Sequence, residues 1–199
     1  MIINKINVRR TDLQPVWVYD SLGQVGNLSY SLLTKKQKLM PRKPVLKYKN
    51  YDVHSITTVS PLGKVNANIA TWVMQSAMQG KFLTVALYKT DYTIQLVRES
   101  MILNVNLLAQ DQGKKLIPKL GRKSGSTSNK FVNLPFEMDE RGCPFLTEAI
   151  GYIQCKCVGS IDSGDHELFV CEVLKQVTLN PDKEVLTNNY LRENGLVRG

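Results

Sequence analysis

The sequence contains only two histidines, His54 and His166, among its 199 residues. A Ser-His-Asp catalytic triad is therefore poorly supported. The chain also has no H-E-x-x-H motif, no P-loop and no G-x-G-x-x-G motif, and without the last of these a Rossmann-type dinucleotide site has no support. Hydrolytic chemistry is therefore poorly supported, whereas an enzyme in which a cofactor performs the chemistry does not need such groups.

Long hydrophobic runs are absent as well. No apolar run approaches ~18 residues, so we expect no transmembrane helix and no membrane partner. The first residues, MIINKINVRRTDLQ, lack an apolar core followed by a small-residue cleavage site, which predicts no secretory signal and a cytoplasmic location. The hydrophobic fraction of 43% and the charged fraction of 22% are those of a chain that can build a core.

The four cysteines are Cys143, Cys155, Cys157 and Cys171. They have neither a C-x₂-C spacing nor a second ligand pair, so we expect no metal site. A disulfide framework is not expected in a cytoplasmic chain of this length. Cys155 and Cys157 lie two apart in a strand-like run and so share one face of a sheet. We interpret the cysteines as small buried or half-buried thiols, and a redox-active Cys155–Cys157 pair is the alternative.

Acidic residues are missing from two basic stretches of this chain, whose formal net charge is +9. Residues 34–50 carry seven Lys or Arg, and residues 113–130 carry six, without an acid in either stretch. Such stretches attract anions, although a solvated surface is the alternative. In the second stretch, residues 121–126 form a Gly- and Ser-rich loop with several anion donors, which favours a role in binding a cofactor.

Val, Ile, Thr, Phe and Tyr dominate the chain from residue 51 onward. Strand-like runs occupy residues 53–59, 64–77, 82–88, 102–108, 149–158 and 167–177, separated by Gly, Pro, Asn or Asp. This pattern predicts an antiparallel barrel or sandwich. Helical spacing predicts one helix over 92–100 and another over 111–120, where Pro118 would disturb the last turn.

We expect three regions along the chain. Residues 1–50 form an N-terminal extension that packs on the barrel or on a dimer partner, residues 51–180 form the main domain, and residues 181–199 form a C-terminal tail. Within the extension, residues 16–19 and 25–33 flank a candidate hairpin turn at 20–23. Pro41 and Pro44 then interrupt a basic linker.

Four sequence blocks, spread over residues 51–178, resemble the flavin reductase-like, FMN-binding split-barrel family. Residues 66–71 (NANIAT) are similar to the family's T-A-N-S-x-T segment, with Asn66 and Ile69 in place of the usual Thr and Ser. Residues 85–93 (VALYKTDYT) resemble a strand that ends in a basic residue before a Thr-rich helix start. Residues 104–112 contain the V-N-x-L strand end, and residues 163–173 contain the G-D-H segment.

The resemblance implies a mainly β fold, an antiparallel split β-barrel of Greek-key character with two or three helices. It also implies noncovalent FMN, with FAD as the alternative, and a homodimer. The implied activity is that of a flavin-dependent oxidoreductase: an NAD(P)H-linked flavin reductase, or a flavoredoxin-type electron-transfer protein with a redox partner protein. No side-chain acid or base is obligatory, because the cofactor carries the hydride chemistry.

Carried onto this sequence, the resemblance implies cofactor-binding roles for Asn66, Ala67, Asn68, Ile69, Thr71, Lys89, Thr90, Tyr92, Thr93, Asn106, Leu107, Arg122, Ser124 and Phe131. Lys89, Thr90 and Thr93, beside the free N–H groups of a helix start, suit a phosphate. The alternative is that Thr90 or Asp91 simply caps that helix. His166 is a candidate for a position near the flavin. We expect Trp72 to pack in the core, and stacking near the flavin is the alternative.

The competing hypothesis is a noncatalytic basic β-barrel that binds nucleic acid or another anionic partner. Trp17, Tyr48 and Tyr51 would stack on bases beside the basic stretch at 34–50. We regard nucleic acid as the less favoured partner, because the four blocks occur in the order and spacing of the flavin family.

Overall fold

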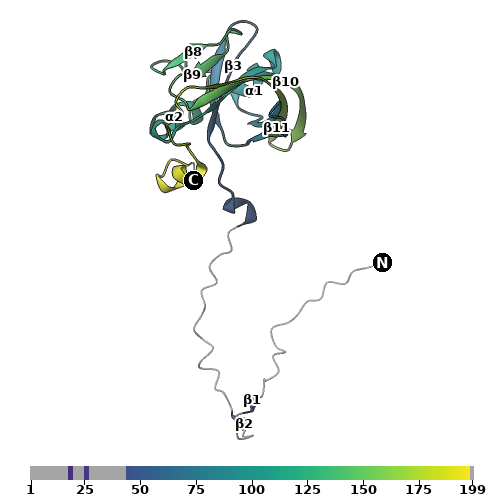
Figure 1. The fold of residues 1–199 in the computed structure, drawn as a ribbon, viewed down its shortest axis with the longest axis vertical. Coiled ribbons are helices and arrows are strands. Elements are labelled where there is room, and N and C mark those ends of the chain that lie inside the picture. Colours follow the sequence, from purple (N-terminus) through teal and green to yellow (C-terminus); the bar gives the residue numbers. More distant parts are fainter. Residues whose placement is uncertain (1–17, 20–24, 27–43, 198–199) are drawn as a thin grey trace, which may run out of the picture. The chain divides into compact units, whose positions relative to one another are not determined.

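The computed structural model describes residues 18–19, 25–26 and 44–197 (Figure 1). The chain divides into two units, Met1–Pro44 and Val45–Gly199. In the first unit, β1 (Val18–Tyr19) pairs antiparallel with β2 (Val25–Gly26). This pairing confirms the predicted hairpin around residues 20–23. The remainder of that hairpin and residues 34–43 of the basic linker lie outside the described residues.

The second unit begins with a 3₁₀ turn, η2 (Val45–Tyr48), and is built on a seven-stranded antiparallel sheet. In spatial order the strands are β4 (Val65–Ala70), β3 (His54–Val59), β7 (Ile102–Leu107), β10 (Gly151–Ser163), β11 (His166–Thr178), β6 (Phe82–Tyr88) and β5 (Val73–Gln75). Figure 1 shows this sheet curling around itself, with the long β10 and β11 on one side.

The curl follows from the connection between β4 and β5. These strands form opposite edges of the sheet, yet only Thr71 and Trp72 separate them in the sequence. The two edges must therefore meet, and the barrel is split where they do. The predicted antiparallel split barrel is confirmed. The prediction of one strand over 64–77 is wrong, because the chain leaves one edge at Ala70 and joins the other at Val73.

Three α-helices are present in the described part of the chain, in agreement with the prediction. α1 (Tyr92–Ser100) packs against β3 and β4. After the 3₁₀ turn η3 (Gln110–Gln112), α2 (Gly113–Gly121) packs on β4 and contains Pro118, which cannot donate a backbone hydrogen bond to the carbonyl four residues earlier. α3 (Asn188–Glu193) lies in the predicted C-terminal tail. None of the helices in residues 44–197 is long and apolar enough to cross a membrane.

Two apolar clusters hold the fold together. Alternate residues of β6, Leu83, Val85 and Leu87, point into the barrel and pack with Phe169 of β11. A second cluster joins the other face of β4, through Ala67, to α2 and to the segment around α3. The burial of both faces of β4 fixes the strand from which several candidate site residues project.

All four cysteines are buried free thiols, as the sequence predicted. Burial raises the pKa of Cys143 and of Cys155 to about 12, which keeps both protonated at neutral pH. The sulfur of Cys157 lies 3.7 Å from that of Cys171 on the paired strand.

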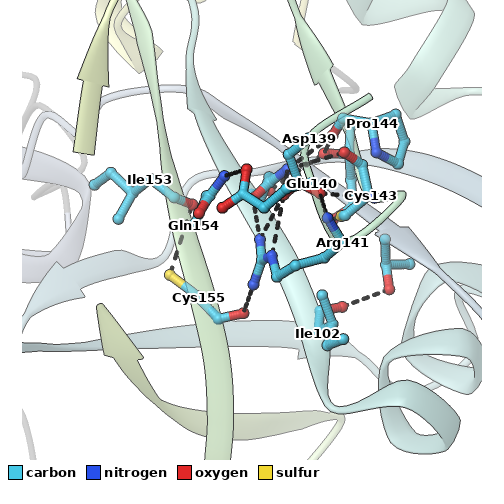
Figure 2. Close-up of polar contacts among 12 residues, drawn as sticks. Ile102, Asp139, Glu140, Arg141, Cys143, Pro144, Ile153, Gln154 and Cys155 are labelled. Carbon is cyan, nitrogen blue, oxygen red and sulfur yellow. Dashed lines mark hydrogen bonds and ion pairs between the residues drawn. The ribbon is translucent and has the colours of Figure 1, made fainter. Parts of the chain in front are cut away.

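A buried polar network attaches the β8 (Phe136–Met138) and β9 (Pro144–Leu146) hairpin to the sheet (Figure 2). The Arg141 guanidinium donates to Asp139 at 2.8 Å, to Asn104 of β7 at 2.6 Å and to the Cys155 carbonyl of β10 at 2.9 Å. Burial opposes the charge of Asp139, but hydrogen bonds from Arg141, the Cys143 N–H and Asn104 hold the pKa of Asp139 below its usual range. The pair therefore acts as a structural anchor between elements.

Candidate cofactor-binding site

A cavity of about 760 Å³ opens where the barrel is split. Its wall comes from the end of β4 and the connection to β5, the start of α1, the end of α2 with the following loop, and the segment around α3. This volume lies within the range of small-molecule sites. The predicted site residues that line it are Asn68, Ile69, Thr71, Thr90, Tyr92, Thr93, Arg122 and Ser124.

Three other predicted residues, Asn66, Ala67 and Lys89, do not line this cavity. Asn66 is buried and donates to the Thr93 hydroxyl at 3.0 Å. Ala67 packs in the second apolar cluster. Lys89 does not line the cavity, because successive residues at a strand end point to opposite sides: Tyr88 faces the cavity and Lys89 pairs with Asp162.

The remaining predicted residues lie deeper in the protein. Asn106 is fully buried and joins strands, since its amide donates to the Ser55 carbonyl at 3.0 Å. Leu107 is half-buried at the end of β7, and Phe131 belongs to the second cluster. The structure thus places these three residues in the framework, and none of them lines the cavity.

The start of α1 lines the cavity and has no side-chain cap. Asp91 occupies the N-cap position, but its side chain makes no capping hydrogen bond. Its carboxylate accepts instead from the Asn68 amide at 3.2 Å. The capping role considered for Asp91 is therefore wrong, and the first N–H groups of α1 keep their capacity to bind an anion.

The loop after α2 approaches the same region very closely. A Cβ atom on Gly125 would lie 2.0 Å from Oδ1 of Asn66, so this position has room only for glycine without movement of a neighbour. Because Asn66 also bonds Thr93, the loop and the start of α1 meet at this side chain. Arg122 and Lys123 of the loop are exposed and line the cavity.

A buried cation, which the sequence reasoning did not single out, also lines the cavity. The Lys130 ammonium donates to the Ala67 carbonyl at 2.7 Å and to the Leu120 carbonyl at 2.8 Å. Burial lowers the pKa of Lys130, and the charge of Asp91 opposes that shift. In the sequence Lys130 was a charge of the basic stretch beside the predicted site residue Phe131, and neither signal marked it as a buried residue.

Aromatic side chains form a further part of the site wall. The expectation that Trp72 packs in the core is wrong, since it is 50% exposed and lines the cavity. Its ring centroid lies 4.7 Å from that of His166, and the Tyr88 ring lies 5.2 Å from His166. These three residues also line an adjoining cavity of about 150 Å³. His166 Nδ1 lies 2.6 Å from the Asp165 carboxylate.

The C-terminal segment contributes an apolar wall that sequence reasoning did not anticipate. Leu191, Leu196 and Val197 line the cavity together with Ile117 and Leu120 of α2. The site therefore combines an apolar side, a polar strand edge and a group of cations.

The fold is shared with solved flavin proteins. Flavin reductase PheA2 superimposes with a TM-score of 0.61 at 25% identity, over 71% of this chain and 87% of that one. Flavoredoxin from Methanosarcina acetivorans gives a TM-score of 0.61 at 19% identity, over 69% and 84% of the two chains. The class of protein is thus an antiparallel split barrel of the flavin reductase and flavoredoxin type.

The sequence comparisons identify the family. The flavin reductase-like domain matches residues 50–192. A ferric-chelate reductase (NAD(P)H) from Archaeoglobus fulgidus is 30% identical over 139 residues, 69% of this chain and 81% of that protein. A high molecular weight rubredoxin from Moorella thermoacetica is 24% identical, over 62% of this chain but only 55% of its own length.

The chain belongs to the flavin reductase-like domain family, and it is a flavin oxidoreductase. The resemblance seen in the four sequence blocks is confirmed, and so is the general function that it implied.

Proposed function

We propose that the 760 Å³ cavity holds FMN and that the protein passes reducing equivalents from NAD(P)H through this flavin to an acceptor. The observation that carries the proposal is the composition of the cavity wall. A strand edge at Asn68–Thr71 lies at one part of the wall, and Arg122, Lys123 and the start of α1 lie at another. A planar polar heterocycle joined to a phosphate needs both surfaces.

The donor set fits FMN at the phosphate end. The uncapped start of α1 offers backbone N–H groups, and the close approach at Gly125 brings Ser124 and Arg122 toward it. Among the hydroxyl residues predicted to hold the phosphate, Thr90 and Thr93 line the cavity. We therefore assign the phosphate to the region between the start of α1 and residues 122–125, with Lys89 outside it.

The ring end is assigned to β4 and to the residues that follow it. The buried oxygen Oδ1 of Asn68 has no hydrogen-bond partner in the described part of the protein, which fits a ligand that brings its own donor. Ile69 and Trp72 supply apolar surface on either side. FMN, when bound, would accept a hydride and release electrons singly or in pairs; the protein supplies position, polarity and partial exclusion of water.

NAD(P)H is proposed as the electron donor because the ferric-chelate reductase relative carries that donor in its name.

A second copy of the chain is proposed to cover the mouth of the site. Trp72 and Tyr88 line the site, Met74 follows Trp72 by two residues on β5, and these three apolar side chains (Trp72, Tyr88, Met74) are 50%, 42% and 64% exposed in that order, as is common at interfaces. Light scattering during size-exclusion chromatography would measure the oligomeric state.

Colour and titration test the function. We expect the purified full chain to be yellow, with the absorbance of oxidised flavin, and to lose that absorbance when NADH or NADPH is added without oxygen. A colourless protein that carries nucleic acid and does not bind added FMN would overturn the proposal in favour of the noncatalytic binding module. If the protein binds flavin but neither NADH nor NADPH reduces it, NAD(P)H is excluded as the electron donor, and a redox protein becomes the proposed donor.

A further inference from the structure

Asp91 holds a position where its side chain ordinarily stabilises a helix. Asp is among the preferred N-cap residues because its oxygen accepts from an N–H group in the first turn. Here the carboxylate makes no such bond to α1. It bonds Nδ2 of Asn68 at 3.2 Å, across the wall of the cavity. The helix thus forgoes its side-chain cap, and the carboxylate is committed to a residue of the proposed flavin site.

That bond fixes the orientation of the Asn68 amide. An ionised carboxylate can only accept hydrogen bonds, whereas an amide has a donor end and an acceptor end. The Asn68 NH₂ group must therefore point to Asp91, and its oxygen points away. Asn68 is only 5% exposed and lines the cavity, and its Oδ1 has no partner in residues 44–197. A buried acceptor in this state is stabilised by any ligand that donates to it.

We propose that Asp91 is a positioning residue, which orients Asn68 so that Oδ1 accepts a hydrogen bond from a ring N–H of the bound flavin. The inference rests on the proposed function. The oxidised isoalloxazine ring carries one ring N–H, at N3, and this group donates but cannot accept. A ribityl hydroxyl does both and would tolerate either orientation of the amide. An orientation fixed by a carboxylate therefore selects for the ring N–H.

Charge and orientation make opposite predictions for the removal of Asp91. The carboxylate is a negative charge in a cavity that also contains Arg122 and Lys123, so on Coulombic grounds its neutralisation should tighten the binding of FMN, an anion. If orientation governs, the same change lets the Asn68 amide turn over and present its NH₂ group to the ring N–H. Flavin binding then weakens. The sign of the change in affinity separates the two effects.

The experiment measures dissociation constants of riboflavin and FMN by flavin fluorescence, with the full chain freed of its cofactor. Riboflavin lacks the phosphate and so reports mainly on the ring end. Asp91→Asn is expected to raise the riboflavin dissociation constant by about three- to tenfold, the loss of one buried hydrogen bond. The control is Asp182→Asn, an exposed carboxylate outside the cavity. It removes the same charge and should leave the constant unchanged.

A reciprocal exchange provides the rescue. The double variant Asn68→Asp with Asp91→Asn keeps one amide and one carboxylate but reverses their order, and it again presents an acceptor to the ring. It should recover most of the riboflavin affinity that Asp91→Asn loses. N3-methylriboflavin, which lacks the donor, should bind the wild type more weakly than riboflavin does, and Asn68→Ala should abolish that difference.

Tighter or unchanged riboflavin binding in Asp91→Asn overturns the inference, and so does a double variant that binds no better than the single one. Equal binding of riboflavin and its N3-methyl form by the wild type overturns the assignment of the ring N–H. In each case the flavin function stands. A wild-type chain that binds no flavin at all would instead overturn the proposed function, and the inference with it.

Discussion

Replacement of Gly125 by alanine is a direct test of how the loop after α2 meets the start of α1. The added Cβ would lie 2.0 Å from Oδ1 and 2.8 Å from Nδ2 of Asn66, far inside contact distance. Either Asn66 moves or the loop moves. Asn66 is 2% exposed and holds the Thr93 hydroxyl at 3.0 Å. The loop is exposed, and Ser124, Ser126 and Ser128 bond mainly with one another.

The loop should therefore yield first. Displacement of Asn66 would break a buried hydrogen bond and leave its donor unsatisfied, at a cost of about 1–3 kcal/mol. An outward shift of an exposed loop costs less, but it takes Arg122 and Ser124 away from the proposed phosphate position. We expect Gly125→Ala to lower the free energy of unfolding by less than about 1 kcal/mol and to raise the FMN dissociation constant about tenfold, one lost charge-assisted hydrogen bond.

Two measurements on Gly125→Ala, of stability and of flavin affinity, test this prediction. Urea denaturation measures the stability of the flavin-free chain, and fluorescence titration measures the affinities of FMN and riboflavin. Because the loop is assigned to the phosphate, riboflavin affinity should change much less than FMN affinity. Gly159→Ala is the matched control, since a Cβ at Gly159 has no atom within 4 Å. An equal loss of affinity for both flavins, or wild-type behaviour in both assays, would refute the reasoning.

Three further predictions concern the framework. Arg141→Ala should lower the free energy of unfolding by about 3–5 kcal/mol in chemical denaturation, because it leaves the Asp139 carboxylate buried without its cation; a loss below ~1 kcal/mol would show that the network in Figure 2 is dispensable. Burial lowers the pKa of His54 from 6.5 to about 4 although Asp52 opposes the shift. Below pH 6.5 the unfolded chain therefore binds a proton at His54 that the folded chain does not bind. The free energy of unfolding should fall by about 1.4 kcal/mol per pH unit down to pH 4, and His54→Leu should flatten that slope. Removal of residues 1–44 should leave the FMN dissociation constant within about twofold, since the described residues that line the cavity fall between Asn68 and Val197; a larger rise would give the N-terminal extension a part in the site.

The elements that sequence reasoning located well are those whose signal is local. α1 and β6 begin and end where the pattern predicted, because helical spacing and strand alternation are properties of adjacent residues. The break between β4 and β5 was missed. Nothing in residues 64–77 by itself marks the point where one sheet edge ends and the other begins, since that point depends on the order of all seven strands.

In the candidate site, too, local sequence signals located some residues, and the overall fold decided the position of others. The resemblance of two sequence blocks implied roles for Asn68, Ile69 and Thr71 and for Thr90, Tyr92 and Thr93, and all six line the cavity. Lys89 was chosen as the basic residue at a strand end before a helix start, but its side chain pairs with Asp162. The contribution of Leu191 could not be predicted. It depends on hydrogen bonds that tie the C-terminal segment to the residue just before β3, such as Val53 N to the Leu186 carbonyl at 2.8 Å.

The location of the cavity at the split has a physical reason. In a sheet, a strand with neighbours on both sides uses its backbone donors and acceptors on both sides, whereas an edge strand leaves one row unused. β4 pairs with β3 only, so its other edge needs partners. Lys130 satisfies one carbonyl of that row, at Ala67. A planar heterocycle with lactam-like edges presents donors and acceptors suited to the remainder, as a further strand would. β5 follows β4 after only Thr71 and Trp72 and pairs with β6 instead, so the edge of β4 remains available to the proposed flavin.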